Sequence, residues 1–239
     1  MSISMSRISS VVGIRHAPWI PSCKTASGTT ASVMSDNSVV AKLAERAART
    51  RVAGYQDDIE RLLQGALDTM RRCGTTSRPR VADIVAAAGL SNDAFYRHFS
   101  SKDDLVAALL EDGTQRLASY LTHQMSKAPT PEAKIATWVD GVLSQAIDPD
   151  IAATTIAVVW NADRVSDANG FGMSRANAML SRLIVESFTE LGNPNPELAA
   201  RLATHAVVGC LHDHLWKSTS PRPDDVQFLA ATCVAIARC

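Results

Sequence analysis

Apolar residues recur every three or four positions along most of this chain, which is the spacing that gathers them on one face of an α-helix. The sequence shows no strand-like alternation of apolar and polar residues. The spacing, together with capping residues and Gly or Pro at the breaks, predicts helices over residues 57–72, 81–88, 92–99, 102–125, 148–161, 173–191 and 196–216, with two more starting at Pro131 and Pro223. We therefore expect an all-α protein.

The most informative stretch is residues 81–102, which read VADIVAAAGLSNDAFYRHFSSK. Its first helix has Ile84, Val85 and Ala88 on one face and ends at Gly89, because glycine adopts the left-handed conformation of a helix end at little cost. Ser91 then offers its side-chain oxygen to the free N–H groups of a second helix. The stretch predicts two helices joined by a tight glycine turn.

The second of these helices has an apolar side and a polar side. Phe95 and Phe99 face the first helix and contribute to a shared core. The opposite side has a size that suits a DNA major groove, and it carries Asn92, Asp93, Tyr96 and Arg97. A hairpin with a purely structural role has no need of Tyr96, His98 and Lys102 around one helix end, so the pattern favours a DNA-binding unit.

This stretch resembles the DNA-binding signature of the TetR family of transcription regulators, roughly I-A-x-x-A-G-V-S-x-G-T-L-Y-x-H-F-x-x-K. The matching positions are Ile84, Ala87 or Ala88, Gly89, Ser91, Tyr96, His98, Phe99 and Lys102. The resemblance implies an N-terminal three-helix helix-turn-helix domain, followed by a helical domain that binds a ligand and forms the dimer.

The resemblance also implies roles for single residues. Tyr96, His98 and Lys102 match positions that grip DNA phosphates, and Ser91 adds its hydroxyl and backbone N–H. The positions that face base edges are Asn92, Asp93 and Arg97. Two residues depart from the signature: Asp93 stands in place of Gly, and Ala94 in place of a Thr that often binds phosphate.

The first helix of the DNA-binding domain is predicted over residues 57–72, which carry a broad apolar face. Asp57 is the expected N-cap, and Gly74 follows the helix end. In the loop that comes next, Ser77 or Arg78 is expected to cap the helix at 81–88.

The N-terminal residues have a different character. Residues 1–37 are rich in Ser and Thr, and the first acidic residue is Asp36, so we expect a disordered arm. A transit peptide and a translation start at Met34 are alternatives. Residues 38–51 then form a basic helix or arm, which is either a solvated surface or a segment that touches phosphates or the minor groove. Its cations are Lys42, Arg46, Arg49 and Arg51.

The helices after residue 101 predict a regulatory domain, which the helix over 102–125 joins to the DNA-binding domain. In the resembled family the corresponding elements surround a cavity, and large or adaptable apolar side chains occur on them here. The expected ligand pocket consists of Trp138, Val142, Trp160, Met173, Met179 and Leu183. A small hydrophobic effector would suit this pocket, and a filled core is the alternative reading.

The last two helices carry stripes of small and apolar residues. On the penultimate helix they are Ala199, Ala203, Ala206 and Cys210, and on the last Val226, Leu229, Ala230, Cys233 and Ile236. Such stripes belong either to the core or to a four-helix interface between two copies. The resemblance implies the second, a homodimer.

Charge changes this picture only slightly. The formal net charge is zero. Residues 1–105 hold 14 Lys and Arg against 10 Asp and Glu, and residues 106–239 hold 10 against 14. Within residues 57–105, however, the counts are 7 against 8. We therefore expect DNA affinity to depend on where the cations stand more than on bulk charge.

The sequence shows little sign of other chemistry. The five cysteines are scattered without zinc spacing, which suits a reducing cytoplasm, and no apolar run reaches the length of a membrane helix. His205, His212 and His214 suggest a metal, but residues two apart on a helix point to different sides. No catalytic or phosphate-loop motif is present. We expect neither metal nor cofactor, and no enzymatic activity.

Together these patterns predict an arm over residues 1–37, a helix-turn-helix domain with a basic extension over 38–101, and a regulatory and dimerisation domain over 102–239. The function expected is a cytoplasmic, ligand-responsive repressor that binds a palindromic operator as a dimer. Two alternatives stay open: a helical architectural or interaction protein that binds DNA without a small-molecule switch, and an all-helical enzyme.

Overall fold

The computed structural model describes residues 39–163 and 172–239. The predicted arm over 1–37 and most of the predicted loop at 163–172 lie outside these residues. Within them the chain forms nine α-helices, one 3₁₀ turn and no strand, which confirms the all-α prediction. The first turns of α1, up to Ala47, belong to a unit separate from Ala48–Cys239.

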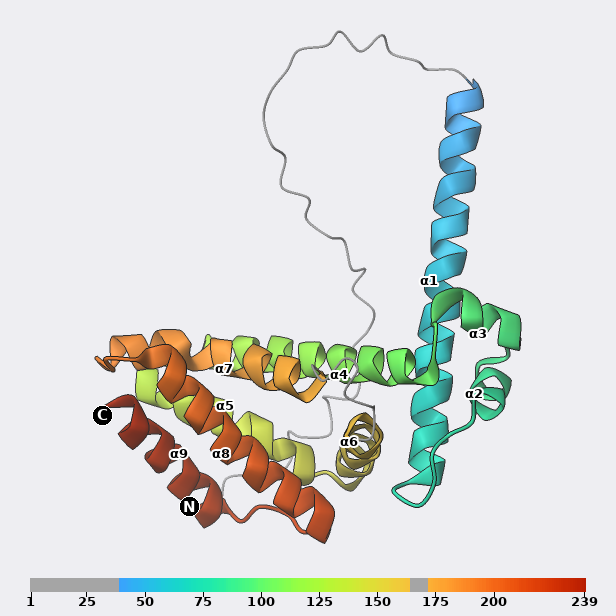
Figure 1. Cartoon of the computed structure of the whole chain (residues 1–239). Coiled ribbons are helices and arrows are strands. Elements are labelled where there is room, and N and C mark those ends of the chain that lie inside the picture. Colours follow the sequence, from blue (N-terminus) through green and yellow to red (C-terminus); the bar gives the residue numbers. More distant parts are fainter. Residues whose placement is uncertain (1–38, 164–171) are drawn as a thin grey trace, which may run out of the picture. The chain divides into compact units, whose positions relative to one another are not determined.

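The helices follow the predicted order (Figure 1). Their bounds are α1 Val39–Cys73, α2 Val81–Ala88, α3 Asn92–His98, α4 Lys102–Met125, α5 Pro131–Leu143, α6 Pro149–Ala162, α7 Gly172–Glu190, α8 Pro196–Lys217 and α9 Pro223–Ala237, with the 3₁₀ turn at Ser144–Ala146 between α5 and α6.

Helix α1 is much longer than predicted. It runs without interruption from Val39 to Cys73, so the expected start at Asp57 is wrong. Asp57 lies inside the helix, and its carboxylate is 3.7 Å from the guanidinium of Arg61 one turn later. The helix continues because residues 39–53 are rich in Ala, Lys, Glu and Arg, which form helices readily. Gly54 costs only about 1 kcal/mol in such a position.

The cap of α2 also differs from expectation. Arg80 stands at the N-cap, and its side chain makes no capping hydrogen bond, so the cap by Ser77 or Arg78 is wrong. Ser77 lies three residues before the N-cap position, which is too early to reach the first turn. The guanidinium of Arg78 instead donates to the carboxylate of Asp103 at 2.9 Å.

The head, which we define as residues 55–101, has a small apolar core made by α1, α2 and α3. Leu62, Ile84 and Phe95 are fully buried in it. The core also includes residues from outside the head: Leu105, Val106, Leu109 and Leu110 of α4, with Ala157 and Val158 of α6. The head therefore completes its core with side chains from helices that follow residue 101.

The larger core belongs to residues 102–237, which we call the body. Trp138, Ile184 and Phe188 are fully buried there, together with the inner faces of α5 and α8. α7 packs against both α4 and α8, and α9 packs against α5 and α8. Oxygens of Thr130, Asp148 and Asn195 cap α5, α6 and α8, each followed by a proline at the first helical position.

Within the described ranges, no single helix has the length and apolar character needed to cross a membrane. The segments Pro131–Ala146 and Pro149–Ala162 meet that test only as a pair, across a bend of 86°.

Candidate nucleic-acid interface

The turn between α2 and α3 has the predicted geometry. Gly89 adopts the left-handed conformation with φ 65° and ψ 35°, and the N–H of Leu90 donates to the carbonyl of Val85 at 2.9 Å. The side-chain oxygen of Ser91 accepts from the N–H of Ala94 at 3.2 Å, which caps α3. Because both helix ends at this turn are satisfied, the angle between α2 and α3 is well defined.

α3 presents the expected polar face. Ala94 and Phe95 are buried against the rest of the head, whereas the ring of Tyr96 is 60% exposed. The other exposed residues of this helix are Asn92, Asp93 and Arg97. The outward face therefore offers amide, carboxylate, hydroxyl and guanidinium groups, which are the groups that read base edges and bind phosphates.

Lys102 begins α4 close to a second cation. Partial burial lowers the pKa of the Lys102 ammonium, the nearby charge of Arg78 lowers it further, and Asp103 opposes both. Arg78 itself pairs with Asp103, and its buried Nε has no hydrogen-bond partner. A DNA phosphate placed here would relieve the repulsion between the two cations. Sequence reasoning missed Arg78, because nothing in the loop pattern brings it to the start of α4.

His98 does not share the exposure of its neighbours. Its side chain is 1% exposed, and its Nε2 lies 3.3 Å from a carboxylate oxygen of Asp58 on α1. The ring of Tyr55 lies edge-on to it, with 4.2 Å between ring centroids. A phosphate contact through this ring would require it to leave this position.

α1 also holds the end of α2 through a polar side chain. The guanidinium of Arg61 donates from Nε to the carbonyl of Ala88 at 3.0 Å and from Nη2 to that of Gly89 at 2.9 Å. These carbonyls lie at a helix C-terminus, where helical partners are missing. Tyr55, Asp58 and Arg61 are spaced three residues apart along α1, but no sequence pattern predicted that this row meets the ends of α2 and α3.

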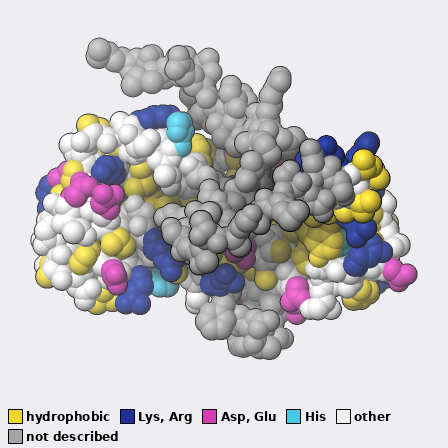
Figure 2. Space-filling view, turned by 90° about the horizontal axis from the view of Figure 1, so that it is seen from above, with side chains coloured by type: hydrophobic (Ala, Val, Ile, Leu, Met, Phe, Trp, Pro, Cys, Tyr) yellow, Lys and Arg dark blue, Asp and Glu magenta, His cyan; other side chains and the backbone are white. Residues whose placement is uncertain are grey.

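Basic and acidic side chains are interspersed on the face shown in Figure 2, which accords with the equal numbers of Lys plus Arg and Asp plus Glu, 24 each, in the whole sequence. Among the described residues, no group of three or more His, Cys, Asp or Glu could hold a metal ion.

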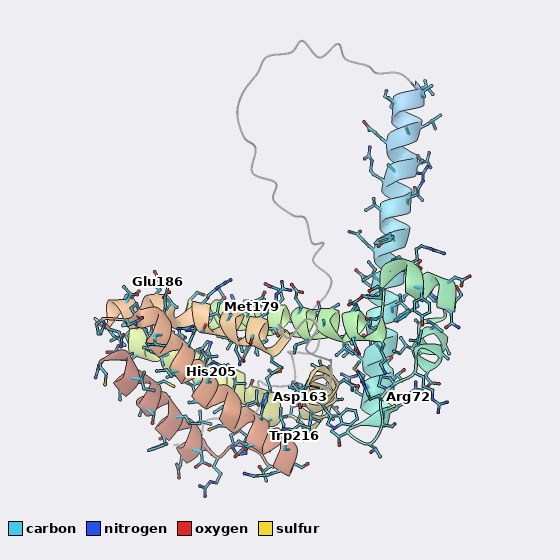
Figure 3. All side chains as sticks on the ribbon, in the orientation of Figure 1. Arg72, Asp163, Met179, Glu186, His205 and Trp216 are labelled. Carbon is cyan, nitrogen blue, oxygen red and sulfur yellow. The ribbon has the colours of Figure 1, made fainter. Side chains whose placement is uncertain are left out.

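Four of the six predicted pocket residues are distributed between the two cores. Trp138 and Val142 are fully buried in the body core, and the indole N–H of Trp138 donates to the carbonyl of Leu180 at 3.2 Å. Leu183 packs against the same core, whereas Met173 packs against the head core. Trp160 is buried at the end of α6, and Met179 is half-buried on α7 (Figure 3).

A surface hollow of about 440 Å³ occurs elsewhere, between the C-terminal part of α1 and α2. Its lining residues are Thr69, Arg72, Cys73, Asp83, Ala86 and Ala87. It shares no residue with the predicted pocket, which stays a prediction.

The predicted interface stripes are partly wrong. Ala199, Ala203 and Cys233 are buried inside this chain, because α7 packs over that face of α8 and α9 packs inward. Burial raises the pKa of the Cys233 thiol to about 11. Ala206 of the predicted stripe is exposed, together with Leu198 and Leu202, which are spaced four apart with it on α8. Trp216 on α8 and Phe228 on α9 are exposed as well.

Comparison with known sequences gives matches over part of the chain. Residues 77–109 match the sequence model of the family described as "Bacterial regulatory proteins, tetR family". Uncharacterized helix-turn-helix transcriptional regulators of Mycobacterium bovis and Mycobacterium tuberculosis are 33% identical over 82 residues, which is 34% of this chain and 42% of each relative. The match thus spans less than half the length of these relatives.

Comparison with solved structures extends over the body. A crystal structure described as a transcriptional regulator from Pseudomonas aeruginosa PAO1 aligns with a TM-score of 0.61 at 22% identity, over 75% of this chain and 89% of that one. A TetR transcriptional regulator from Rhodococcus sp. RHA1 aligns with a TM-score of 0.59 at 17% identity, over 76% and 96%. At these identities the likeness shows a shared fold.

Proposed function

We propose that this chain, which has the DNA-binding domain of the TetR family and the fold of its regulators, is a dimeric repressor that releases an inverted-repeat operator when it binds a small apolar effector. The observation that carries the proposal is the polar face of α3, held outward by the Gly89 turn and the Ser91 cap. DNA binding also requires the compartment that holds DNA, in keeping with the predicted cytoplasmic location.

In this proposal, phosphate contacts position the head on DNA. Tyr96 is exposed beside the buried Phe95, Lys102 stands at the start of α4, and Ser91 opens α3. Their replacement should weaken binding to all DNA sequences alike. Lys102→Ala should also reduce the slope of log K against log salt concentration by about one.

Base recognition is assigned to Asn92, Asp93 and Arg97. Asn pairs well with adenine, Arg with guanine, and a carboxylate can accept from cytosine, at about 1–3 kcal/mol of discrimination for a good contact. A binding-site selection with Arg97→Ala should lose preference at one base pair in each half-site. An unchanged selected sequence would remove Arg97 from this role.

The proposed dimer interface uses the exposed apolar residues of α8 and α9. Leu202 is 55% exposed and Phe228 is 71% exposed. Leu202→Glu or Phe228→Glu would bury an unpaired charge between the two copies, and we expect monomers that bind DNA weakly. Ile147→Glu, at an exposed apolar site outside α8 and α9, is the matched control. Analytical ultracentrifugation distinguishes monomer from dimer.

Two recognition helices related by two-fold symmetry need half-sites about one helical turn apart, or a multiple of it. Footprinting on the operator should therefore protect an inverted repeat. Protection of one asymmetric half-site would contradict the dimeric mode of binding.

The effector switch rests on how the body meets the head. An effector shifts the equilibrium only if it binds one arrangement of the two heads more tightly than the other. Ala157 and Val158 of α6 lie in the head core, and Arg71 of α1 donates to the hydroxyl of Thr154 at 2.6 Å. A ligand beside Trp160 would act on the same helix, so a shift of α6 reaches the head without an intermediate.

A DNA-binding architectural protein without a switch is the second candidate, because Trp138 and Val142 fill the body core in this structure. Apolar compounds added to the protein–operator complex separate the two, with DNA release and Trp fluorescence recorded together. Release that weakens in Trp160→Phe supports the switch. Operator binding that no compound alters would favour the architectural role. Absence of sequence-specific binding would refute the repressor, and absence of any DNA binding would refute both.

A further inference from the structure

His98 is the last residue of α3, and its side chain is enclosed by the protein. Its ring is 1% exposed, although Tyr96 and Arg97 immediately before it face outward. Polar side chains are rarely enclosed in this way without a partner inside the protein. Here the partner is Asp58 on α1, whose carboxylate oxygen is 3.3 Å from Nε2.

The hydrogen bond of the His98 ring to Asp58 selects one tautomer of the ring. Nε2 faces the carboxylate of Asp58, so it carries the proton and donates. Nδ1 is buried and has no hydrogen-bond partner. The ring is therefore attached to α1 through one nitrogen, and the Tyr55 ring packs against it in a T-shaped arrangement with 4.2 Å between ring centroids. A phosphate oxygen could replace Asp58 only after the ring had turned out of this enclosure.

α3 has only seven residues, so its two ends largely determine where its side chains point. The N-terminal end is held by the Gly89 turn and the Ser91 cap. The C-terminal end is held by the bond from His98 to α1, while Phe95 fills the core between the two ends. If the C-terminal end were released, Tyr96 and Arg97 could move relative to the major groove of bound DNA.

We propose that His98 is a positioning residue: its bond to Asp58 fastens the C-terminal end of the recognition helix to α1 and sets the pose of Tyr96 and Arg97 on DNA. This inference rests on the proposed operator binding. It assigns His98 an internal role and leaves the phosphate contacts to Tyr96, Lys102 and Ser91.

The test compares His98→Gln with His98→Asn. The amide nitrogen of Gln can take the place of Nε2 and donate to Asp58, whereas the Asn side chain is one carbon shorter and cannot reach. We expect His98→Asn to weaken operator binding about tenfold, the range set by loss of one hydrogen bond, and His98→Gln to restore most of it. Thermal unfolding of both variants accompanies the binding measurements.

Salt dependence separates positioning from phosphate contact. Both His98 variants should keep the wild-type slope of log K against log salt, because the number of neutralised phosphates is unchanged. Lys102→Ala, the control, should lower the slope by about one. Equal losses of affinity in the Gln and Asn variants, with a lowered slope in both, would overturn the inference.

A second readout needs no DNA. In the wild-type protein, nitrogen-15 NMR should show a ring N–H of His98 at Nε2 that exchanges slowly with water, identified by its disappearance in His98→Gln. Asp58→Ala should make that exchange fast. A ring that exchanges as a free imidazole in the wild type would refute the bond, whether or not the protein binds an operator. Absence of operator binding in the wild type would instead refute the proposed function.

Discussion

The head and the body are both helical, but they are held together by different kinds of contact. In the head, polar side chains of α1 bind the ends of α2 and α3, and Gly65 lets α1 approach so closely that a Cβ there would lie 2.8 Å from the backbone N of Ala88. In the body, broad apolar faces pack around Trp138, Ile184 and Phe188. A few specific contacts determine how the helices of the head are arranged, whereas the packing of buried apolar side chains determines how the helices of the body are arranged.

This difference explains why similarity is distributed unevenly. The family sequence model matches residues 77–109, where particular residues set particular angles. Structures only 17–22% identical to the chain still align over three quarters of it, because many apolar sequences satisfy the same helix packing. The family sequence match thus covers part of the head and the start of α4, whereas the structural likeness extends over the body.

The largest expected effect comes from removing volume in the body. Ile184 is fully buried, so Ile184→Ala should lower the free energy of unfolding by about 2–5 kcal/mol in urea titration. Ile147→Ala, at a site that is 46% exposed, should change it much less. Ile184→Leu conserves volume and should cost less than about 1.5 kcal/mol. A loss with Leu as large as with Ala would mean that the body also depends on exact shape.

The head should not tolerate even one methyl group where its helices meet. Gly65→Ala places a Cβ 2.8 Å from Ala88 N and 2.9 Å from Ile84 O, both backbone atoms, and we expect a loss of about 1–3 kcal/mol in stability. Gly54→Ala in the same helix meets nothing within 4 Å and should stabilise by about 0.5–1 kcal/mol. Equal effects of the two changes would show that α1 does not need this close approach.

The hydrogen bond between Arg71 and Thr154 links head and body, so its removal should have a smaller, mixed effect. We expect Thr154→Val to cost about 0.5–1.5 kcal/mol in stability and to change the effector concentration that releases DNA. Thr155→Val, on the neighbouring position of α6, is the control. A Thr154 variant with wild-type stability and release would leave the connection between the two regions to the apolar contacts of α4 and α6.

The smallest expected effect is a pH dependence in the body. Burial lowers the pKa of His212, while Asp163 and Asp213 oppose the shift. Because the folded pKa lies below the unfolded value of 6.5, the unfolded chain binds more protons between the two values. The contribution of neutral His212 to the free energy of unfolding is therefore complete above pH 6.5 and is lost as pH falls through the folded pKa. In His212→Gln, the free energy of unfolding from urea titration should change less between pH 7.5 and 5.5 than in the wild type. An unchanged pH profile would contradict this assignment.

Local signals in the sequence predicted local structure well. Gly89, Ser91, Thr130 and Asn195 mark helix ends where they were expected, because each acts on backbone groups within a few residues. The exposure of Asn92, Asp93, Tyr96 and Arg97 also follows from helix period, and the structure confirms it. Their contacts with DNA remain a prediction.

Contacts between distant residues were not predictable in the same way. Arg61 meets Ala88 across 27 positions, Asp58 meets His98 across 40, and Arg71 meets Thr154 across 83. A periodic pattern says which face of a helix is apolar, but not which turn of another helix it meets. Ala199 and Ala203 show the same limit, since a stripe of small residues fits a core and an interface equally well until its neighbours are known.

The shared core of the head has a consequence during synthesis on the ribosome. The chain emerges from its N-terminus, so the recognition helix leaves the tunnel well before Ala157 and Val158, which complete the core around Leu62 and Phe95. At about 5–20 residues per second, the newly made head waits roughly 3–11 seconds for α6. Throughout that interval it displays apolar surface, and a chaperone or a neighbouring nascent chain can bind there before the head first meets DNA.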